Sequence, residues 1–498
     1  MLRSLIKESI SEEEFFSSIY QTVPKVFASN DEQYEHRDES PKNINGTKNE
    51  ADVQNHKCNT NGNLNDSNKK RKIESTTENY DHDLLFNKII SLNVNDITNV
   101  LEISRRTFDL ISSPSNNGNI VPTPLFFKDK NVLSADDMLD LYNNNPLAAY
   151  VDGCSIILNH LELIKEDSIG KLCKELEKNP SFPTCFANGY LTPPNSQAVS
   201  AHADDRDVFI LQVFGAKNWK VYKDVPIPFP YHHEQVGKNG IPIPQSIVTK
   251  KPLIERKLVP GDVLYMPRGF VHEAYTVCNQ KASFHITIAL PTHDWSYSNI
   301  FNLVSRQLLD QDVSLRKAIN PLSNNSTDVE QHIQHMITIL QQNINSKSLI
   351  NMLHQKSKIH EEKSIQISQY LSSQITLPNN IDSFIGYDAV HMIQFSSTIR
   401  AATDIERKLT IEQEKSTLEQ PIKKARGLTV REENGDILFS ILQYIKSNPK
   451  DTFVISKLRT LPCCSMYNDN NDCIIDNLSI LCFIKCCVEF GAIALVSA

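Results

Sequence analysis

The most regular hydrophobic pattern of the chain lies between Thr184 and Leu290, where short apolar runs alternate with turns that contain Gly or Pro. Runs rich in β-branched and aromatic residues, bounded by such turns, predict β-strands. The predicted strands are residues 208–214 (VFILQVF), 219–222 (WKVY), 262–267 (DVLYMP), 272–277 (HEAYTV) and 283–290 (SFHITIAL). Short strands at this close spacing are typical of a β-barrel or a β-sandwich.

The pattern becomes helical after Pro291. Apolar residues recur every four positions at Ile300, Val304 and Leu308, which predicts an amphipathic helix. We therefore expect an α-helical module over residues 296–415.

A second helix of this module is predicted to open at Thr327, with Glu330 as the partner in a capping box. Its apolar stripe consists of Val329, Ile333, Ile337 and Leu340. Two interpretations stay open, because such stripes suit a homodimer interface and equally suit packing of the helices on the barrel.

Two flanking regions complete the pattern. Residues 11–29 predict a helix followed by an extended segment, with Ser11 as the N-cap and Glu14 three residues later. Residues 428–498 predict two helices and a final strand (AIALV, 492–496), an arrangement that fits a winged helix or a unit that serves only for packing.

Composition changes the picture between Asp31 and Tyr80, where only 8 of 50 residues are hydrophobic. Such a segment cannot bury enough apolar surface to offset the entropy lost on ordering, so we expect a disordered insertion over residues 31–80. It carries a basic run, Lys69-Lys70-Arg71-Lys72. That run fits a nuclear-import signal or an ordinary solvated charge run.

Length, charge and cysteine content exclude several classes. A chain of 498 residues predicts two or three domains, and a net charge of -8 argues against a polycation that binds nucleic acid along its whole length. We expect neither a secretory signal nor a membrane-spanning helix. The odd number of cysteines, 11, favours reduced thiols. Six lie in the last 36 residues without a C-x2-C pair, so buried thiols fit better than a zinc site.

The candidate chemistry is a His-x-acid pair beside a strand. Residues i and i+2 of an extended chain point to one face, so an imidazole and a carboxylate at this spacing can share a metal ion. The pattern occurs five times, at His36/Asp38, His160/Glu162, His202/Asp204, His232/Glu234 and His360/Glu362. Only His202/Asp204 directly precedes a strong predicted strand and has a distal partner, His272, in a matching turn-strand-corner context. Two imidazoles and one carboxylate would form the facial triad of non-haem Fe(II) oxygenases.

The segment from Phe186 to Trp295 resembles the JmjC oxygenases of the ribosomal-oxygenase branch. The matching phrases are NGYLTPP (188–194), HADDRDVFILQVFGAKNWKVY (202–222), GDVLYMPRGFVHEA (261–274) and FHIT (284–287). The resemblance implies an α+β fold with a JmjC/cupin double-stranded β-helix core over residues 1–30 and 81–295. The α-helical module and a C-terminal winged-helix-like domain would follow it.

The resemblance also assigns site residues. His202, Asp204 and His272 occupy the positions of the iron ligands, and Lys217 that of the lysine that pairs with the distal carboxylate of 2-oxoglutarate. The alternative for Lys217 is a solvated hairpin lysine, and for His272 a core histidine. Asn188, Tyr190 and Thr287 match positions that line the co-substrate pocket. Ala289 stands where the family usually has a serine, so one hydrogen bond, worth about 1 kcal/mol, would be lost.

The implied activity is hydroxylation of a histidine in a ribosomal protein, with demethylation of histone H3 methyl-lysine as a second activity, in the nucleus and nucleolus. Fe(II) would be the metal and 2-oxoglutarate the co-substrate. Two other classes stay open: a non-catalytic JmjC scaffold that binds chromatin or ribosomal proteins, and another metal-dependent cupin enzyme. Whether nucleic acid is a partner is undecided, and no membrane is expected.

Overall fold

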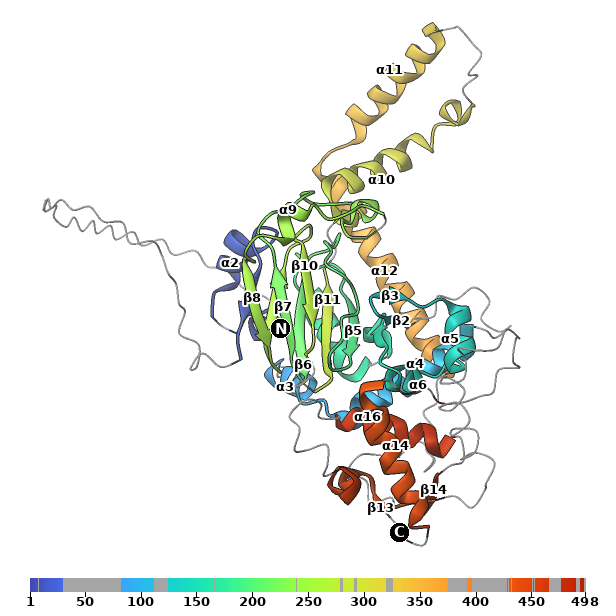
Figure 1. Ribbon diagram of the computed structural model, residues 1–498. Helices are drawn as coiled ribbons and strands as arrows, with labels where there is room; N and C mark the ends of the chain where they lie inside the picture. The colour runs from blue at the N-terminus through green and yellow to red at the C-terminus, as the bar shows by residue number, and fades with distance from the viewer. Residues whose placement is uncertain are drawn as a thin grey trace, which may run out of the picture. The chain divides into compact units, whose positions relative to one another are not determined.

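The fold is described from a computed structural model (Figure 1). It describes residues 1–7, 9–29, 82–111, 124–164, 166–238, 240–277, 281–290, 293–318, 326–374, 392–395, 428, 430, 432–449, 451, 453–464, 476–489 and 493–496. Residues 1–29 and 82–498 form one compact unit. The expected disordered insertion, 31–80, and its basic run lie outside the described residues.

The centre of the fold is an antiparallel sheet of eight strands. In spatial order these are β1 (Lys25–Phe27), β9 (Val263–Met266), β6 (Val208–Phe214), β11 (Ser283–Ala289), β5 (Phe186–Thr192), β4 (Ser155–Leu158), β2 (Leu125–Lys128) and β3 (Asn131–Val132). A second antiparallel sheet contains β10 (His272–Tyr275), β7 (Lys217–Val221) and β8 (Ile254–Leu258). All five predicted strands are confirmed, with small shifts at their ends.

Alternation along β6 explains how the sheets are covered. Val208 and Ile210 belong to an apolar cluster that also contains Trp219 and Val221 of the second sheet, so this face of β6 points between the two sheets. Their neighbours Phe209, Leu211 and Val213 belong to a larger cluster with the surrounding helices. A strand that is buried on both faces reads as a continuous hydrophobic run, as VFILQVF does. The α+β class with a double-sheeted β core is therefore confirmed.

Helices cover the outer face of the larger sheet. The elements before the second sheet are α1 (Leu2–Ile6), α2 (Glu12–Glu14), η1 (Phe15–Ile19), α3 (His82–Ile90), α4 (Val94–Ile111), α5 (Ala135–Tyr142), α6 (Pro146–Val151), α7 (Leu161–Ile164), η3 (Glu166–Gly170) and α8 (Lys171–Glu177). Ser11 caps α2 as predicted, because its Oγ accepts from the Glu14 amide at 3.0 Å. Phe15 then stacks against Phe209 of β6, with ring centroids 5.7 Å apart, and fixes the N-terminal segment to the sheet.

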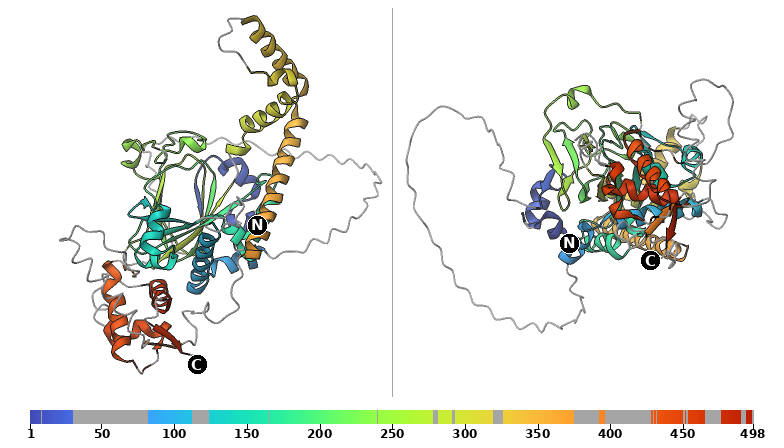
Figure 2. Two further views of the ribbon diagram at one scale, coloured as in Figure 1. Left: turned by 90° about the vertical axis from the view of Figure 1, so that its right-hand side faces the viewer. Right: turned by 60° about the horizontal axis from the view of Figure 1, so that its bottom comes forward.

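The connection between β7 and β8 of the second sheet carries η4 (His232–Glu234) and α9 (Gln245–Val248), and the expected helical module follows the last strand of the core. It comprises η5 (His293–Trp295), α10 (Tyr297–Leu309), η6 (Val313–Arg316), α11 (Ser326–Asn343) and α12 (Ser346–Gln374) (Figures 1 and 2). α11 begins at Ser326, so Thr327 lies inside the helix and is not its cap. Val329, Ile333 and Ile337 are 38%, 37% and 39% exposed, so the α11 stripe is not buried on the barrel. The homodimer stays a prediction.

The C-terminal region combines α14 (Glu432–Ser447), η8 (Ile455–Thr460) and α16 (Asn477–Glu489) with a three-stranded sheet. Its central strand is β12 (Met392–Phe395), between β13 (Phe453–Val454) and β14 (Ile493–Val496). β12 comes from the range expected to be helical, so that expectation was wrong for these four residues. The pairing that holds β12 is with strands about 60 and 100 residues later, which no local pattern reveals. The winged helix stays a prediction.

The thiols of α16 are buried in the core. Cys482, Cys486 and Cys487 are 0% exposed, and burial raises their pKa. The described residues contain no cysteine cluster with the spacing of a metal site. Among the same residues, no helix has the length and apolar character needed to cross a membrane.

Candidate metal centre

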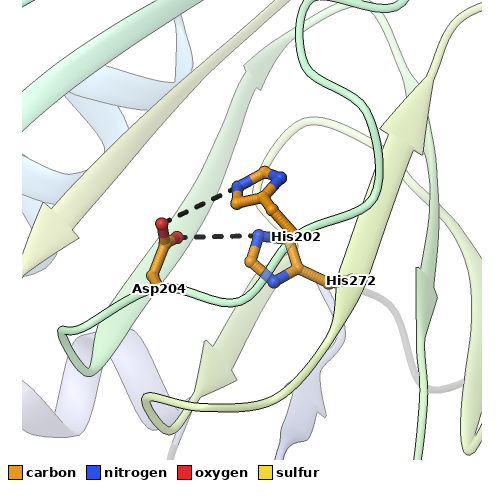
Figure 3. Close-up of side chains that lie close together, drawn as sticks. All are labelled: His202, Asp204 and His272. Carbon is orange, nitrogen blue, oxygen red and sulfur yellow. Dashed lines mark ion pairs between the residues drawn. The ribbon is translucent and has the colours of Figure 1, made fainter. Parts of the chain in front are cut away.

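The structure brings His202, Asp204 and His272 together at the mouth of the barrel (Figure 3). His202 and His272 face each other in an isolated antiparallel bridge, with N···O distances of 3.0 and 2.9 Å in the two directions. Asp204 joins the same corner, because its carbonyl accepts from the Gly269 amide at 2.9 Å. His202 therefore lies in a single bridge before β6 and not in a regular strand, yet its backbone is tied directly to the distal histidine.

The side chains of the three residues converge. His202 Nε2 lies 3.7 Å from Asp204 Oδ1, and His272 Nε2 lies 3.6 Å from Asp204 Oδ2. All three ligand atoms lie within 4.8 Å of one another. Imidazole and carboxylate ligands approach a first-row metal to about 2.0–2.2 Å, so these distances leave room for one ion. It is the one such cluster among the described residues.

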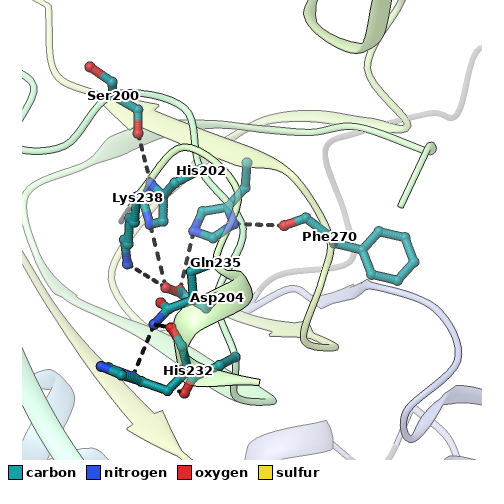
Figure 4. A network of polar contacts seen from close by, with 9 residues as sticks. Ser200, His202, Asp204, His232, Gln235, Lys238 and Phe270 are labelled. Carbon is teal, nitrogen blue, oxygen red and sulfur yellow. Dashed lines mark hydrogen bonds and ion pairs between the residues drawn. The ribbon is translucent and has the colours of Figure 1, made fainter. Parts of the chain in front are cut away.

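Backbone carbonyls orient both imidazoles. His202 Nδ1 lies 2.7 Å from the Ser200 carbonyl, and His272 Nδ1 lies 3.0 Å from the Phe270 carbonyl (Figure 4). A carbonyl oxygen only accepts, so each Nδ1 must carry the proton and each Nε2 keeps its lone pair. Such outer hydrogen bonds are what metal-binding histidines use to fix their tautomer. The donor set therefore fits a divalent transition metal.

The electrostatics agree with neutral imidazoles beside an ionised carboxylate. Burial, with Lys238 and His272 nearby, lowers the pKa of His202 to about 3. Burial also lowers the pKa of His272. Burial alone would raise the pKa of Asp204, but the Lys238 ammonium and the two imidazoles lower it below its ordinary value. Neutral imidazole and carboxylate are the forms that bind metal.

A cavity of about 450 Å³ opens from the three residues into the space between the two sheets. Lys217 and Thr287 line it on opposite sheets. Lys217 is 3% exposed, and its Nζ donates to Thr192 Oγ1 at 2.8 Å. Burial lowers the pKa of Lys217 to about 7. The solvated-hairpin alternative for Lys217 is thereby excluded, and the buried cation pairs with no carboxylate of the described chain.

Tyr190 and Asn188 were both expected to line the pocket, but only Tyr190 does so. Tyr190 lines the cavity and stacks on His285, with ring centroids 4.7 Å apart. Asn188 does not line the cavity. Its Oδ1 accepts from the His160 amide at 3.0 Å, and a side-chain hydrogen bond joins it to Tyr190. Of these two residues, both expected to line the pocket, Tyr190 is a cavity residue and Asn188 supports it.

Lys238, Trp219 and His285 are among the cavity residues that were not predicted. Lys238 donates to Asp204 Oδ1 at 2.6 Å from a loop that carries no recognisable motif. Trp219 and His285 lie 5.3 Å apart, edge to face, in the wall of the cavity. A signal for His285 was available, because on β11 it shares the face of Thr287 two residues later. Ala289 continues that face and is buried among apolar side chains.

Comparison with known proteins agrees with this geometry. Residues 157–299 match the family described as the JmjC domain. The chain is 35% identical over 185 residues to the bifunctional lysine-specific demethylase and histidyl-hydroxylase NO66 of Drosophila sechellia, a match that covers 34% of this chain and 25% of that protein. The Drosophila melanogaster protein of the same name is 35% identical over 177 residues, with the same coverages. The chain thus spans about a quarter of the length of these curated relatives.

Among solved structures, the chain is similar to Escherichia coli ycfD, at 11% identity and a TM-score of 0.35, and the match covers 98% of this chain and 99% of that one. The ribosomal oxygenase YcfD from Escherichia coli in complex with cobalt and 2-oxoglutarate is 14% identical with a TM-score of 0.27, covering 75% and 86%. Such scores are too low to carry an argument about this chain. Residues 157–299, which match the JmjC domain, include His202, Asp204 and His272, and in sequence the chain is similar to the NO66 proteins over about a third of its length.

Proposed function

We propose that this protein is an Fe(II)- and 2-oxoglutarate-dependent oxygenase that hydroxylates a histidine of a ribosomal protein. One observation carries the proposal: two tautomer-fixed imidazoles and a carboxylate converge at one end of a cavity, and a buried lysine without a carboxylate partner lines the same cavity. This combination suits a metal-chelating dicarboxylate, whose far end requires a cation in a buried site.

The residues have separate tasks in this proposal. His202, Asp204 and His272 would hold the iron, and the Ser200 and Phe270 carbonyls keep both Nε2 lone pairs directed at it (Figure 4). When bound, iron supplies the redox chemistry that activates O2 with 2-oxoglutarate as the electron source.

Lys217 would neutralise the distal carboxylate of 2-oxoglutarate, and Thr287 lends a hydroxyl from the facing strand. Tyr190 lines the same cavity, and a side-chain hydrogen bond joins it to Asn188. Ala289 offers no hydroxyl, so the anchoring depends more heavily on Lys217. Apolar side chains around the cavity exclude water from the reacting centre.

The substrate proposal rests on the relatives and on the cavity mouth. The NO66 proteins carry both activities in their name, histidyl hydroxylation and lysine demethylation. The mouth of the cavity is apolar on the side of β2 and β3, where Leu125, Phe127 and Val132 line it. An apolar lip favours an uncharged side chain such as neutral imidazole, so hydroxylation is the first candidate and histone H3 demethylation the second.

Two readings compete with an oxygenase. A non-catalytic scaffold would bind its partners without turning over 2-oxoglutarate. Another metal-dependent cupin enzyme would bind the metal but gain no stability from 2-oxoglutarate, whereas an oxygenase should be stabilised by it.

The deciding experiment incubates the full chain with Fe(II), 2-oxoglutarate and O2 in the presence of ribosomal proteins or histone H3 peptides. We expect succinate release and the gain of one oxygen on a histidine, detected by mass spectrometry. His202→Ala should abolish both, whereas His332→Ala, on the exposed face of α11, should leave both unchanged. Loss of a methyl group from lysine would instead favour demethylation, and absence of succinate from the wild-type protein would support the scaffold.

The nuclear and nucleolar location is proposed on the same resemblance and on the Lys69-Lys70-Arg71-Lys72 run. Replacing these four residues by Ser in a fluorescent fusion of the full chain should move the protein out of the nucleus. Unchanged nuclear signal would assign the run to a solvated charge cluster.

A further inference from the structure

Lys238 is the second cation of the cavity and has no role in the proposed function. It lines the cavity, and its Nζ lies 2.6 Å from Asp204 Oδ1 (Figure 4). The other oxygen of the carboxylate, Oδ2, faces His272. Lys238 is thus beside the candidate metal centre, while Lys217 is paired with Thr192 on β5.

The loop that carries Lys238 is tied to the metal-ligand segment itself. The Ala203 amide donates to the Val236 carbonyl at 2.8 Å, and Val236 is 2% exposed. Gly237 has a φ of +80°, and a Cβ there would lie 2.5 Å from the Ala201 carbonyl and 2.8 Å from His202 Cα. Such close approach between backbones is open only to glycine, so the fold sets the backbone position of Lys238, and the contact with Asp204 holds its ammonium group.

The charges that line the cavity are few. Among the described residues they are the Asp204 carboxylate and the ammonium groups of Lys217 and Lys238. Burial holds the pKa of His285 well below its ordinary value, so this imidazole adds no charge. The two charges of a divalent ion and those of dianionic 2-oxoglutarate cancel. The lining therefore leaves one net positive charge facing whatever enters next.

We propose that Lys238 is a specificity-determining residue whose charge turns cationic side chains, methyl-lysine among them, away from the metal centre and admits neutral ones. The inference rests on the proposed function and names the substrate class of that site. Two unit charges about 6 Å apart interact by several times the thermal energy when partly shielded from water, and by less in salt. A permanent cation at the reacting position feels this repulsion, whereas a neutral imidazole does not.

The test measures the local potential with two probes of one shape, tetramethylammonium and tert-butanol. The full chain is loaded with Mn(II) and 2-oxoglutarate without O2, and the relaxation of each probe's methyl protons by Mn(II) reports its local concentration. In the wild-type protein at low salt we expect the cation to be depleted about threefold or more relative to the alcohol. At 1 M salt, where the screening length is about 3 Å, the depletion should shrink.

Three variants locate the charge. Lys238→Met should bring the ratio of the two probes close to one, and Lys238→Arg should keep the depletion. Lys250→Met removes the same charge from an exposed lysine that pairs with Asp224, and it should also keep the depletion. Thermal unfolding of each variant establishes that it is folded. An unchanged ratio in folded Lys238→Met overturns the inference. If Mn(II) does not load in the wild-type protein, as read from its free-ion resonance, the metal centre itself is wrong and this inference falls with it.

Discussion

Two segments of the chain share the same His-x-acid spacing and differ in everything around it. In residues 160–162, His160 Nδ1 lies 2.9 Å from Glu162 Oε1, so the histidine and the carboxylate bind each other. In residues 202–204, the imidazole binds a backbone carbonyl instead and stays 3.7 Å from the carboxylate, with His272 facing both. The His-x-acid spacing alone therefore does not identify a metal site. What distinguishes a candidate metal site is a partner for each Nδ1 other than its own acid.

The surroundings of the two carboxylates extend this comparison. Glu162 also accepts from the Ala187 amide at 2.8 Å, so its charge is satisfied by backbone and His160 together. The hydrogen bond between His160 and Glu162 is the main cause that raises the pKa of His160, whereas burial, together with the nearby Lys238 and His272, lowers the pKa of His202. The first pair is a structural ion pair beside β5, and the second is arranged to share a third group.

The comparison is tested most strongly by removing each histidine. His202→Ala should abolish Mn(II) binding and reduce succinate formation by at least about a hundredfold, because it removes one of three ligands and leaves the carboxylate to Lys238. His160→Ala should leave Mn(II) binding within about twofold, since its side chain contacts Glu162 and Phe186 and is not one of the three candidate ligands. Mn(II) titration followed by electron paramagnetic resonance measures both. Equal losses would show that the two segments are not functionally different.

The next effect concerns Lys217. Lys217→Met should weaken 2-oxoglutarate binding about ten- to a hundredfold, the range of one charge-assisted hydrogen bond of about 1.5–3 kcal/mol. Because burial lowers the pKa of Lys217 to about 7, the wild-type affinity should fall as pH rises from 7 to 9, when the ammonium loses its proton. Lys217→Arg should flatten this dependence. Calorimetric titration across pH 6–9 measures it, and a flat wild-type profile would contradict the assignment.

The free energy of unfolding should change with pH in the opposite direction to the affinity for 2-oxoglutarate. In the co-substrate-free protein the folded state releases the Lys217 proton near pH 7, whereas the unfolded chain keeps it up to about pH 10.4. The unfolded state thus binds more protons in this window, and the free energy of unfolding should rise with pH there. Opposite slopes for stability and 2-oxoglutarate affinity would identify a buried, unpaired lysine.

The smallest expected effect concerns the loop of Val236, Gly237 and Lys238, which contacts the 202–204 segment and not the 160–162 segment. Gly237→Ala should destabilise the protein by about 1–3 kcal/mol and weaken Mn(II) binding several-fold, because the added Cβ collides with the Ala201 carbonyl and His202 Cα. Gly240→Ala is the matched control: its φ is +76° but no atom lies within 4 Å, so only about 1 kcal/mol of backbone strain is expected, without a change in metal affinity. Denaturant unfolding and Mn(II) titration distinguish them.

Much of the β core was predictable because its signals are local. VFILQVF became β6 over the residues expected, since a strand buried on both faces leaves a nearly continuous apolar run. SFHITIAL became β11, since its apolar residues alternate with Ser283, His285 and Thr287 at the period of a strand. β12 was missed because its four residues are stabilised by partners far along the chain. The start of α11 was placed one residue late, which is within the usual uncertainty of helix ends.

In the candidate site, the residues to which the resemblance gives a role were predicted, whereas Lys238, Trp219 and His285 were not. His202, Asp204, His272, Lys217, Tyr190 and Thr287 all lie around the cavity. Asn188 lies behind it, because its amide is taken up by the His160 backbone and Tyr190. Lys238 could not be foreseen, since its loop is placed beside Ala201, His202 and Ala203 by the backbone contacts of Val236 and Gly237.

By itself, the sequence determined which residue types stand at which spacing, and hence the strands, the acid-histidine pair and the distal histidine as candidates. Only the tertiary structure decided which of the four described pairs has an opposite imidazole, a carbonyl for each Nδ1 and a cavity with a buried cation. The physical reason is that hydrophobic periodicity is read within a few residues, whereas ligand convergence, burial and net charge depend on segments that meet only after the chain has folded.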